Sequence, residues 1–239
     1  MKREQWGYAN PILSPLYSPP PLIWRDTRVV LVVYETSLEH IQAVLPEPME
    51  PAGNKVIAWV SDTPLGTQGA CCEACLYVQA RYRDHVGTYE PFLYVSTEIP
   101  LAAGREIWGF AKKLADIQLS TERDIYRGEV KRCGVRIMTL QTTADVPASY
   151  DELPWGSGGV FSLKVIPGAE DGEPALHQLV LTEGKVSAVE GHFFRGRGSV
   201  TFEHSEIDPL DLLQPERVIA GYYGVVEMYL PLGKIVHRY

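Results

Sequence analysis

Short apolar runs broken by glycine, proline and charged residues recur along most of the chain, and they predict a molecule built mainly of β-strands. Residues 28–34 form a β-branched run without internal charge, which is typical of a strand buried on both faces. Residues 56–60, 74–82 and 91–98 begin a series of further strand-like segments. The series continues with residues 117–120, 126–131, 135–142, 159–166, 178–186, 189–194, 198–203 and 224–229.

Helical patterns are few and short. Thr36 and Glu39 match a capping box, and the apolar positions after them recur at helical spacing until Pro46, which predicts a first helix. Similar spacing predicts short helices within residues 104–114 and 209–220. Many short strands with brief turns and few helices indicate an α+β fold, a mainly antiparallel sheet or barrel, rather than a βαβ arrangement.

The first 25 residues differ from the rest of the chain. Five prolines fall between positions 11 and 21, and proline fixes φ and lacks a backbone donor, so residues 1–25 are expected to form an extended arm. Its apolar side chains suggest that it lies across the body or a neighbouring subunit, with a ligand segment for another protein as the alternative. No linker or repeat follows, and we expect one domain over residues 26–239.

Composition narrows the class of partner. Hydrophobic residues make up 45% and charged residues 22% of the chain, and the formal net charge is −8. An acidic protein of this kind is not expected to bind nucleic acid or an anionic membrane, since either would need a basic surface. The N-terminal residues lack the apolar core of a signal peptide, and no apolar run is long enough to span a bilayer, so a cytoplasmic location is expected.

The cysteines and histidines do not predict a metal site. Cys72 and Cys75 match a C-x-x-C pattern, but no second pair or zinc-finger histidine pair accompanies them, and the six histidines are scattered. We expect these cysteines to be small buried residues in a strand, and we expect no metal site.

The adjacent lysines Lys112 and Lys113 are the strongest candidates for chemistry. Neighbouring lysines usually lie on a solvated surface, but this pair follows an apolar segment that contains Trp108 and Phe110. An amine must be neutral to attack a carbonyl, and at the ordinary lysine pKa of about 10.4 only about 1 in 2,500 is neutral at pH 7. Burial can lower that pKa by several units, so we expect Lys112 to be a reactive amine in an apolar pocket.

The surroundings of the lysine pair can be predicted in outline. Residues 29–33 and 92–95 are apolar and could form walls of the pocket. Successive helical residues point about 100° apart, so Lys113 need not share the pocket with its neighbour. We expect Lys113 to face a carboxylate instead, with Glu73 and Glu106 as candidates.

At this point the sequence resembles the acetoacetate decarboxylase family. The resemblance rests on Gly104-Arg-Glu106 followed by Lys112-Lys113-Leu114. It extends to Pro46-Glu-Pro-Met-Glu50, residues 162–167, Leu230-Pro231 and the closing Tyr239. It implies an antiparallel, partly closed β-barrel or cone with flanking helices, assembled as a homo-oligomer. It also implies that Lys112 forms a Schiff base with a keto acid without a cofactor.

The chain departs from the family pattern at the pocket. The family carries an arginine just before its first long strand, but an ungapped match puts Thr27 there, with Arg28 one residue late and Arg25 two early. One of two acidic pocket residues falls near Glu73, whereas the other falls on Trp59. A tryptophan in place of an acid implies a more apolar pocket and a substrate other than acetoacetate.

The resemblance and the departures together predict a carbon–carbon lyase that decarboxylates a β-keto acid through an imine on Lys112. One alternative is a pyruvate aldolase-dehydratase that uses the same imine, with Glu73, Tyr77 or Tyr82 as general acid or base. The other is a non-enzymatic binding protein on the same fold. The expected catalytic residues are Lys112, Lys113 and Glu73, and the expected substrate-binding residues are Arg25, Arg28, Trp59, Tyr82, Phe92, Trp108 and Phe110.

Overall fold

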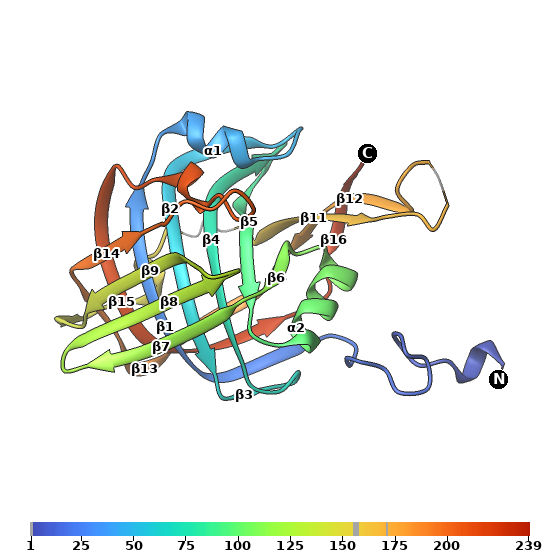
Figure 1. Ribbon diagram of the computed structural model, residues 1–239, viewed down its shortest axis with the longest axis horizontal. Helices are drawn as coiled ribbons and strands as arrows, with labels where there is room; N and C mark the ends of the chain where they lie inside the picture. The colour runs from blue at the N-terminus through green and yellow to red at the C-terminus, as the bar shows by residue number, and fades with distance from the viewer. Residues whose placement is uncertain (1, 155–157, 171) are drawn as a thin grey trace.

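The computed structural model describes residues 2–154, 158–170 and 172–239, and its strands form two sheets (Figure 1). In these ranges the larger sheet runs in the order β10 (Val146–Pro147), β13 (Lys185–Gly196), β15 (Arg217–Leu230), β1 (Leu22–Glu35), β2 (Glu50–Thr63), β4 (Cys71–Tyr82), β5 (His85–Val95), β11 (Val160–Ile166), β12 (Leu176–Thr182) and β16 (Lys234–Arg238). Two short strands also belong to this sheet: β3 (Leu65–Gly66) pairs with β1, and β6 (Lys112–Leu114) pairs with β5. The smaller sheet contains β14 (Gly198–Thr201), β9 (Val135–Thr143), β8 (Ile125–Arg132) and β7 (Asp116–Glu122).

The fold class expected from the sequence is confirmed in its main features. The molecule is mostly β, forms a single domain, and pairs its strands antiparallel except where β5 meets β11 and β6. Over the described residues, β10 and β16 end the larger sheet without pairing with each other, so the expected barrel or cone is not confirmed.

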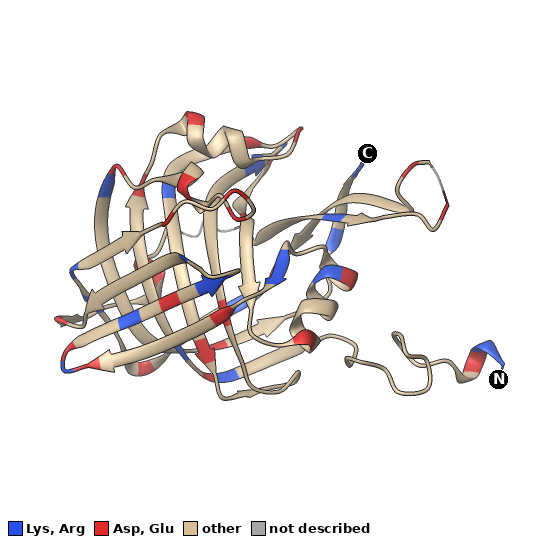
Figure 2. Cartoon of the chain, in the orientation of Figure 1, with Lys and Arg blue, Asp and Glu red and all other residues tan. Residues whose placement is uncertain are grey.

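The central strands of the larger sheet are buried on both faces, and their successive side chains enter two different core clusters. Val30 and Val32 of β1 belong to the core cluster that includes Met138 and other residues of the smaller sheet. Val29 and Leu31 belong to a second cluster on the opposite face. A strand covered on both faces needs apolar residues at every position, which is why residues 28–34 read as one unbroken run. In Figure 2 these central strands are mostly uncharged, and charged residues mark strand ends and the smaller sheet.

The first helix forms where it was expected, but it is capped by a different residue from the one expected. α1 (Leu38–Val44) begins after Ser37, whose hydroxyl accepts a hydrogen bond from the backbone N–H of His40 at 3.1 Å. The predicted capping box at Thr36 is therefore wrong. Thr36 is buried and its hydroxyl lies 3.1 Å from Nδ1 of His40 instead.

The second predicted helix is wrong in its bounds. α2 (Glu98–Ala103) continues directly into η2 (Gly104–Trp108), a single π-helical turn. Gly109 then adopts a φ of 86°, a left-handed conformation that favours glycine and ends the helix. The two lysines consequently lie on β6, beside β5, and not on a helix.

The helix predicted over residues 209–220 is also wrong. Only a 3-10 turn forms there, η4 (Leu210–Leu213), and β15 starts at Arg217. Residues 217–220 pair with the end of β1, so pairing with a neighbouring strand overrides their local pattern. Short 3-10 turns also occur at η1 (Arg3–Gln5) and η3 (Tyr150–Glu152).

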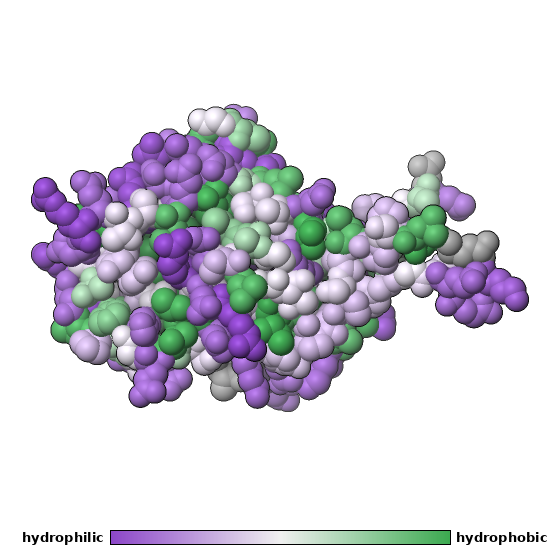
Figure 3. Space-filling view, turned by 90° about the horizontal axis from the view of Figure 1, so that it is seen from below, coloured by the Kyte–Doolittle hydropathy of each residue, from purple (hydrophilic) through white to green (hydrophobic). Residues whose placement is uncertain are grey.

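The chain before β1 leaves the sheets and extends away from them, as Figure 1 shows. Trp6, Tyr8 and Leu13 in this segment are exposed, whereas Tyr17 is buried against the body. On the face shown in Figure 3, hydrophobic residues form small groups separated by hydrophilic ones. Within the described ranges, no helix has the length and apolar character needed to cross a membrane.

Candidate active site

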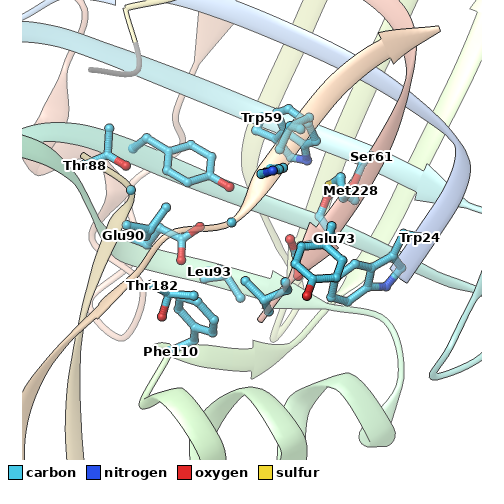
Figure 4. Close-up of a pocket in the computed structure, with 18 of the residues that line it drawn as sticks. Trp24, Trp59, Ser61, Glu73, Thr88, Glu90, Leu93, Phe110, Thr182 and Met228 are labelled. Carbon is cyan, nitrogen blue, oxygen red and sulfur yellow. Dashed lines mark hydrogen bonds between the residues drawn. The ribbon is translucent and has the colours of Figure 1, made fainter. Parts of the chain in front are cut away.

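A cavity of about 540 Å³ lies against the larger sheet on the face of the second core cluster (Figure 4). A volume of this size is typical of small-molecule sites. The side chains that line it come from both ends of the chain and from the strands between them. Apolar lining includes Trp24, Trp59, Leu93, Phe110, Leu153, Val160 and Met228, and polar lining includes Ser61, Thr63, Glu73, Tyr77, Thr88, Glu90, Lys112, Tyr150, Asp151, Thr182 and Lys185.

Strand register places the Lys112 side chain in this cavity. Trp59 on β2 pairs with Cys75 on β4, Cys75 pairs with Leu93 on β5, and Leu93 pairs with Lys112 on β6. Laterally paired residues point to the same face of a sheet, so the lysine is the last member of an otherwise apolar row. Only 6% of the Lys112 surface is exposed.

The Gly104-Arg-Glu106 segment holds the lysine strand in place. A Cβ at Gly104 would lie 2.6 Å from Cδ of Lys112, so only glycine leaves room for the lysine stem. Arg105 donates from Nη1 to the carbonyl oxygen of Lys112 at 3.2 Å. Glu106 accepts a hydrogen bond from the hydroxyl of Tyr17, which ties the N-terminal segment to the same turn. The motif therefore shapes and supports the position of Lys112.

A carboxylate lies beside the buried amine. Nζ of Lys112 is 2.8 Å from Oε2 of Glu73, which stands on β4 two residues before Cys75. Burial lowers the pKa of Lys112, but the adjacent Glu73 carboxylate, with a smaller contribution from Glu90, more than offsets it and leaves the pKa above its ordinary value. Burial is the largest single effect on this pKa, and the carboxylate effects outweigh it only in combination. Glu73 must take a proton, or move away, before the amine can attack a carbonyl.

Lys113 points to the other face of β6, because strand residues alternate. Its Nζ donates to Oδ1 of Asp208 at 2.7 Å, so the predicted partners Glu73 and Glu106 are both wrong. Asp208 is fully buried and also accepts hydrogen bonds from Arg132 at 2.9 Å and from the hydroxyl of Tyr94 at 3.1 Å.

Neither predicted arginine lines the cavity. Arg25 is exposed on β1. Arg28 is also exposed and forms an ion pair with Asp62 of β2. Buried Thr27, between them in the β1 burial pattern, hydrogen-bonds Thr63. Neither arginine side chain therefore lies in this cavity.

The aromatic residues predicted for substrate binding divide into two groups. Trp59 and Phe110 line the cavity, and the ring of Phe110 lies 5.9 Å from Nζ of Lys112. Phe92 and Tyr82 face the first core cluster, and Trp108 packs behind Phe110 and donates to the carbonyl of Pro231 at 2.9 Å. These three do not line the cavity.

Sequence reasoning missed a second acid in the cavity, Glu90. Leu76 of β4 pairs with Phe92, but Val78 pairs with Tyr89, so β5 carries one extra residue at this point. The bulge lets Glu90 and Leu93 face the same cavity although they are three residues apart. Burial, and then the Glu73 carboxylate, raises the pKa of Glu90 to about 8. The available signal was a glutamate beside Pro91, directly before the strand-like segment 91–98.

The described residues include no group of three His, Cys, Asp or Glu side chains placed to hold a metal ion. Cys72 and Cys75 are free thiols, and Cys75 is fully buried. The arrangement instead offers a buried amine, a carboxylate that can exchange a proton with it, and a second acid that is protonated at neutral pH.

Comparison with known proteins identifies relatives over the whole chain. A family model described as acetoacetate decarboxylase (ADC) matches residues 9–239. Acetoacetate decarboxylase 2 of Mesorhizobium japonicum is 29% identical over 239 residues, which cover 98% of this chain and 90% of that protein. The acetoacetate decarboxylase of Acidiphilium cryptum is 28% identical over 240 residues, covering 99% of this chain and 97% of that protein.

Solved structures share the fold. The crystal structure of acetoacetate decarboxylase from Legionella pneumophila matches with a TM-score of 0.88 and 26% identity, covering 99% of this chain and 95% of that one. The enduracididine biosynthesis enzyme MppR complexed with pyruvate matches with a TM-score of 0.83 and 17% identity, covering 97% and 96% of the two chains. At that identity the second likeness shows the fold alone.

Proposed function

Since this chain belongs to the acetoacetate decarboxylase family, we propose that it is a carbon–carbon lyase that decarboxylates a β-keto acid other than acetoacetate through an imine on Lys112. The observation that carries the proposal is the buried Lys112 amine, 2.8 Å from Glu73 inside a cavity large enough for a substrate.

The chemistry follows from this pair. Lys112 passes a proton to Glu73, and the neutral amine attacks the keto carbon and expels water to form an imine. The protonated imine withdraws electrons from the bond to the carboxyl carbon, so that bond breaks, carbon dioxide leaves and an enamine remains. Protonation of the enamine carbon and hydrolysis of the imine release the ketone and restore Lys112.

The lining argues for a substrate larger than acetoacetate. Trp59 contributes a wide apolar surface where the family pattern has an acid, and Trp24 and Met228 add further apolar area. A cavity of about 540 Å³ leaves most of its volume unfilled by a four-carbon acid.

A pyruvate aldolase-dehydratase is the second candidate. Pyruvate bound as an imine would lose a proton to give an enamine, which would add to an aldehyde and then lose water. The specific observation in its favour is Tyr77, which lines the cavity and hydrogen-bonds the carboxyl group of Glu90, a pair suited to proton transfer. Tyr82, the other tyrosine considered for this role, points away from the cavity and hydrogen-bonds His237.

Reductive trapping tests the proposal. The protein is incubated with 3-oxohexanoate, acetoacetate or pyruvate, treated with borohydride, weighed by mass spectrometry and mapped by proteolysis. We expect one adduct on Lys112 that disappears in Lys112→Ala and persists in Lys113→Met, which changes the neighbouring lysine outside the cavity. Absence of an adduct with all three acids favours a non-enzymatic binding protein. Carbon dioxide release distinguishes decarboxylation from formation of an unsaturated condensation product.

A further inference from the structure

Three buried oxygens in the cavity have no hydrogen-bond partner among the described residues: Oγ1 of Thr88, Oε2 of Glu90 and Oγ1 of Thr182. All three side chains line the cavity, and their residues are between 0 and 5% exposed. Figure 4 shows them on the side of the cavity away from Trp24 and Met228. Buried polar groups in folded proteins nearly always have a hydrogen-bond partner. Three unpartnered oxygens in one cavity therefore indicate that a bound ligand provides those partners.

Strand register gathers these residues into one wall. Thr88 of β5 pairs with Val160 of β11, and Val160 pairs with Thr182 of β12, so the two threonines face the same side two strands apart. At the usual strand spacing their backbones lie about 10 Å apart. Glu90 lies two residues along β5 from Thr88, on the same face. The wall is separate from the row that ends in Lys112, which crosses β5 at Leu93.

The chemistry of the wall selects a neutral polar group. A threonine hydroxyl can donate and accept a hydrogen bond. Burial raises the pKa of Glu90 to about 8, so at neutral pH this carboxyl group is mostly protonated and can do the same. The wall therefore carries little charge and matches a group that both donates and accepts. An alcohol hydroxyl has this property, whereas an alkyl end would leave all three oxygens buried and unpaired.

We propose that Thr88, Glu90 and Thr182 form a distal subsite that binds a hydroxyl group, so that the substrate is a keto acid whose far end is hydroxylated. This inference rests on the proposed function, because the subsite gains its meaning from a substrate held at the other end by Lys112. Imine formation fixes one end of the substrate, and the subsite binds the chemical group at the other end.

Stable ketones that correspond to decarboxylated products provide the test. Pentan-2-one, 5-hydroxypentan-2-one and 5-trimethylammoniopentan-2-one differ only at the far end, and each can form an imine that borohydride traps. The measurement is the ketone concentration that gives half-maximal trapping on Lys112. We expect the hydroxyl ketone to reach it at about tenfold lower concentration than pentan-2-one, the effect of roughly one well-made hydrogen bond. The quaternary ammonium ketone should show no such advantage.

Isosteric variants locate the effect. Because the two backbones lie about 10 Å apart, one hydroxyl need not reach both threonines, and at least one of Thr88→Val and Thr182→Val should reduce the advantage of the hydroxyl ketone, relative to pentan-2-one in the same variant, to about threefold or less. Thr88→Ser and Thr182→Ser, which keep the hydroxyl, should retain it. Because trapping of pentan-2-one reports folding and imine formation in every variant, a misfolded variant is recognised, and the other threonine then decides.

The outcomes that overturn the inference differ from those that overturn the proposed function. Equal half-maximal concentrations for the hydroxyl and alkyl ketones, a preference for the cationic ketone, or an advantage that survives both valine variants would each refute the hydroxyl subsite while imine formation stands. Failure to trap any ketone or keto acid on Lys112 would refute the proposed function and the subsite with it.

Discussion

Nζ of Lys113 lies 2.7 Å from Oδ1 of Asp208, on the face of β6 opposite to the amine of Lys112. Asp208 follows β14 by several residues and also binds Arg132 of β8, so one buried carboxylate connects β6 with the smaller sheet. A three-residue strand has few backbone hydrogen bonds of its own. Asp208 therefore joins the lysine strand to the smaller sheet and contributes to the stability of the fold.

Replacement of Asp208 by asparagine should destabilise the protein. The change leaves two cations without their shared carboxylate, and both are partly exposed and can regain water, so we expect a loss of about 2 kcal/mol rather than the larger cost of an isolated buried charge. Urea unfolding measures it. Glu129→Gln is the matched control, since Glu129 also binds two arginines but at a more exposed site, and should cost less. Equal losses would contradict a special role for Asp208.

Neutralising Lys113 should leave the reactivity of Lys112 unchanged. The two side chains occupy opposite faces of β6, and the charge of Lys113 is compensated by Asp208. The pH dependence of acetic anhydride labelling at Lys112, followed by mass spectrometry, should have the same midpoint in Lys113→Met within about half a pH unit. A fall of one unit or more would show that Lys113 tunes the amine.

Removing the charge of Glu73 should shift that midpoint to lower pH. Burial lowers the pKa of Lys112, and the Glu73 carboxylate is the main group that opposes it. In Glu73→Gln burial acts with less opposition, so the amine becomes neutral at lower pH than in the unmodified protein. Decarboxylation should nevertheless fall, because the proton acceptor beside the amine is lost. An unchanged or raised midpoint would mean that Glu73 is not the dominant partner.

Glu90 should make the protein less stable as the pH rises from about 4.5 to 8. The unfolded carboxyl group ionises near its ordinary value of 4.5, whereas burial holds the folded pKa at about 8. Between these values the folded state binds more protons, so stability is full below pH 4.5 and falls until pH 8, by on the order of a few kcal/mol.

Denaturant unfolding at several pH values measures this contribution as the difference between the unmodified protein and Glu90→Gln. The difference should change across the window and become constant above pH 8. Glu183→Gln, at an exposed carboxyl group, should show no such window. A constant difference throughout would mean that Glu90 ionises normally in the folded protein.

The exposed apolar residues of the N-terminal segment predict self-association. Trp6, Tyr8 and Leu13 are 52, 52 and 78% exposed in one chain, and we expect a second copy to cover them. Sedimentation should show an oligomer that weakens in a variant with serine at all three positions. Leu232→Ser, which removes a similarly exposed side chain elsewhere, should not weaken it. A monomeric unmodified protein would contradict the expectation.

Most strands could be predicted from local patterns because they are buried on at least one face. Burial of one face makes apolar and polar residues alternate along a strand. Lys112 was singled out from its sequence motif, and its burial follows from the register between β6 and β5. The motif did not reveal that residues 112–114 are a strand. Their local spacing suits a helix, and only pairing with β5 and the left-handed Gly109 decide otherwise.

The partners of the site residues could not be read from the sequence. Asp208 lies 95 positions from Lys113, and no periodicity connects them. Glu90 enters the cavity because a bulge shifts the alternation of β5, and a bulge depends on how two strands pair. Arg28 lies outside the cavity for a related reason, because a displacement of one residue from Thr27 moves a strand side chain to the other face. Arg25 lies two residues before Thr27, where the register shift between Trp24 and Thr27 interrupts the alternation.

The side of β5 away from β4 is shared by two strands, with β11 beside Thr88 and Tyr89 and β6 beside residues 93–95. Because of this division, the residues that carry out the reaction and the residues that select the substrate can change independently during evolution. Changes in β11 and β12 would alter the far wall of the cavity without disturbing the lysine strand, and a lineage could acquire a new substrate by mutation there while keeping its imine chemistry. Descendants of one ancestor would then be expected to agree around Lys112 and to diverge first around Thr88 and Thr182.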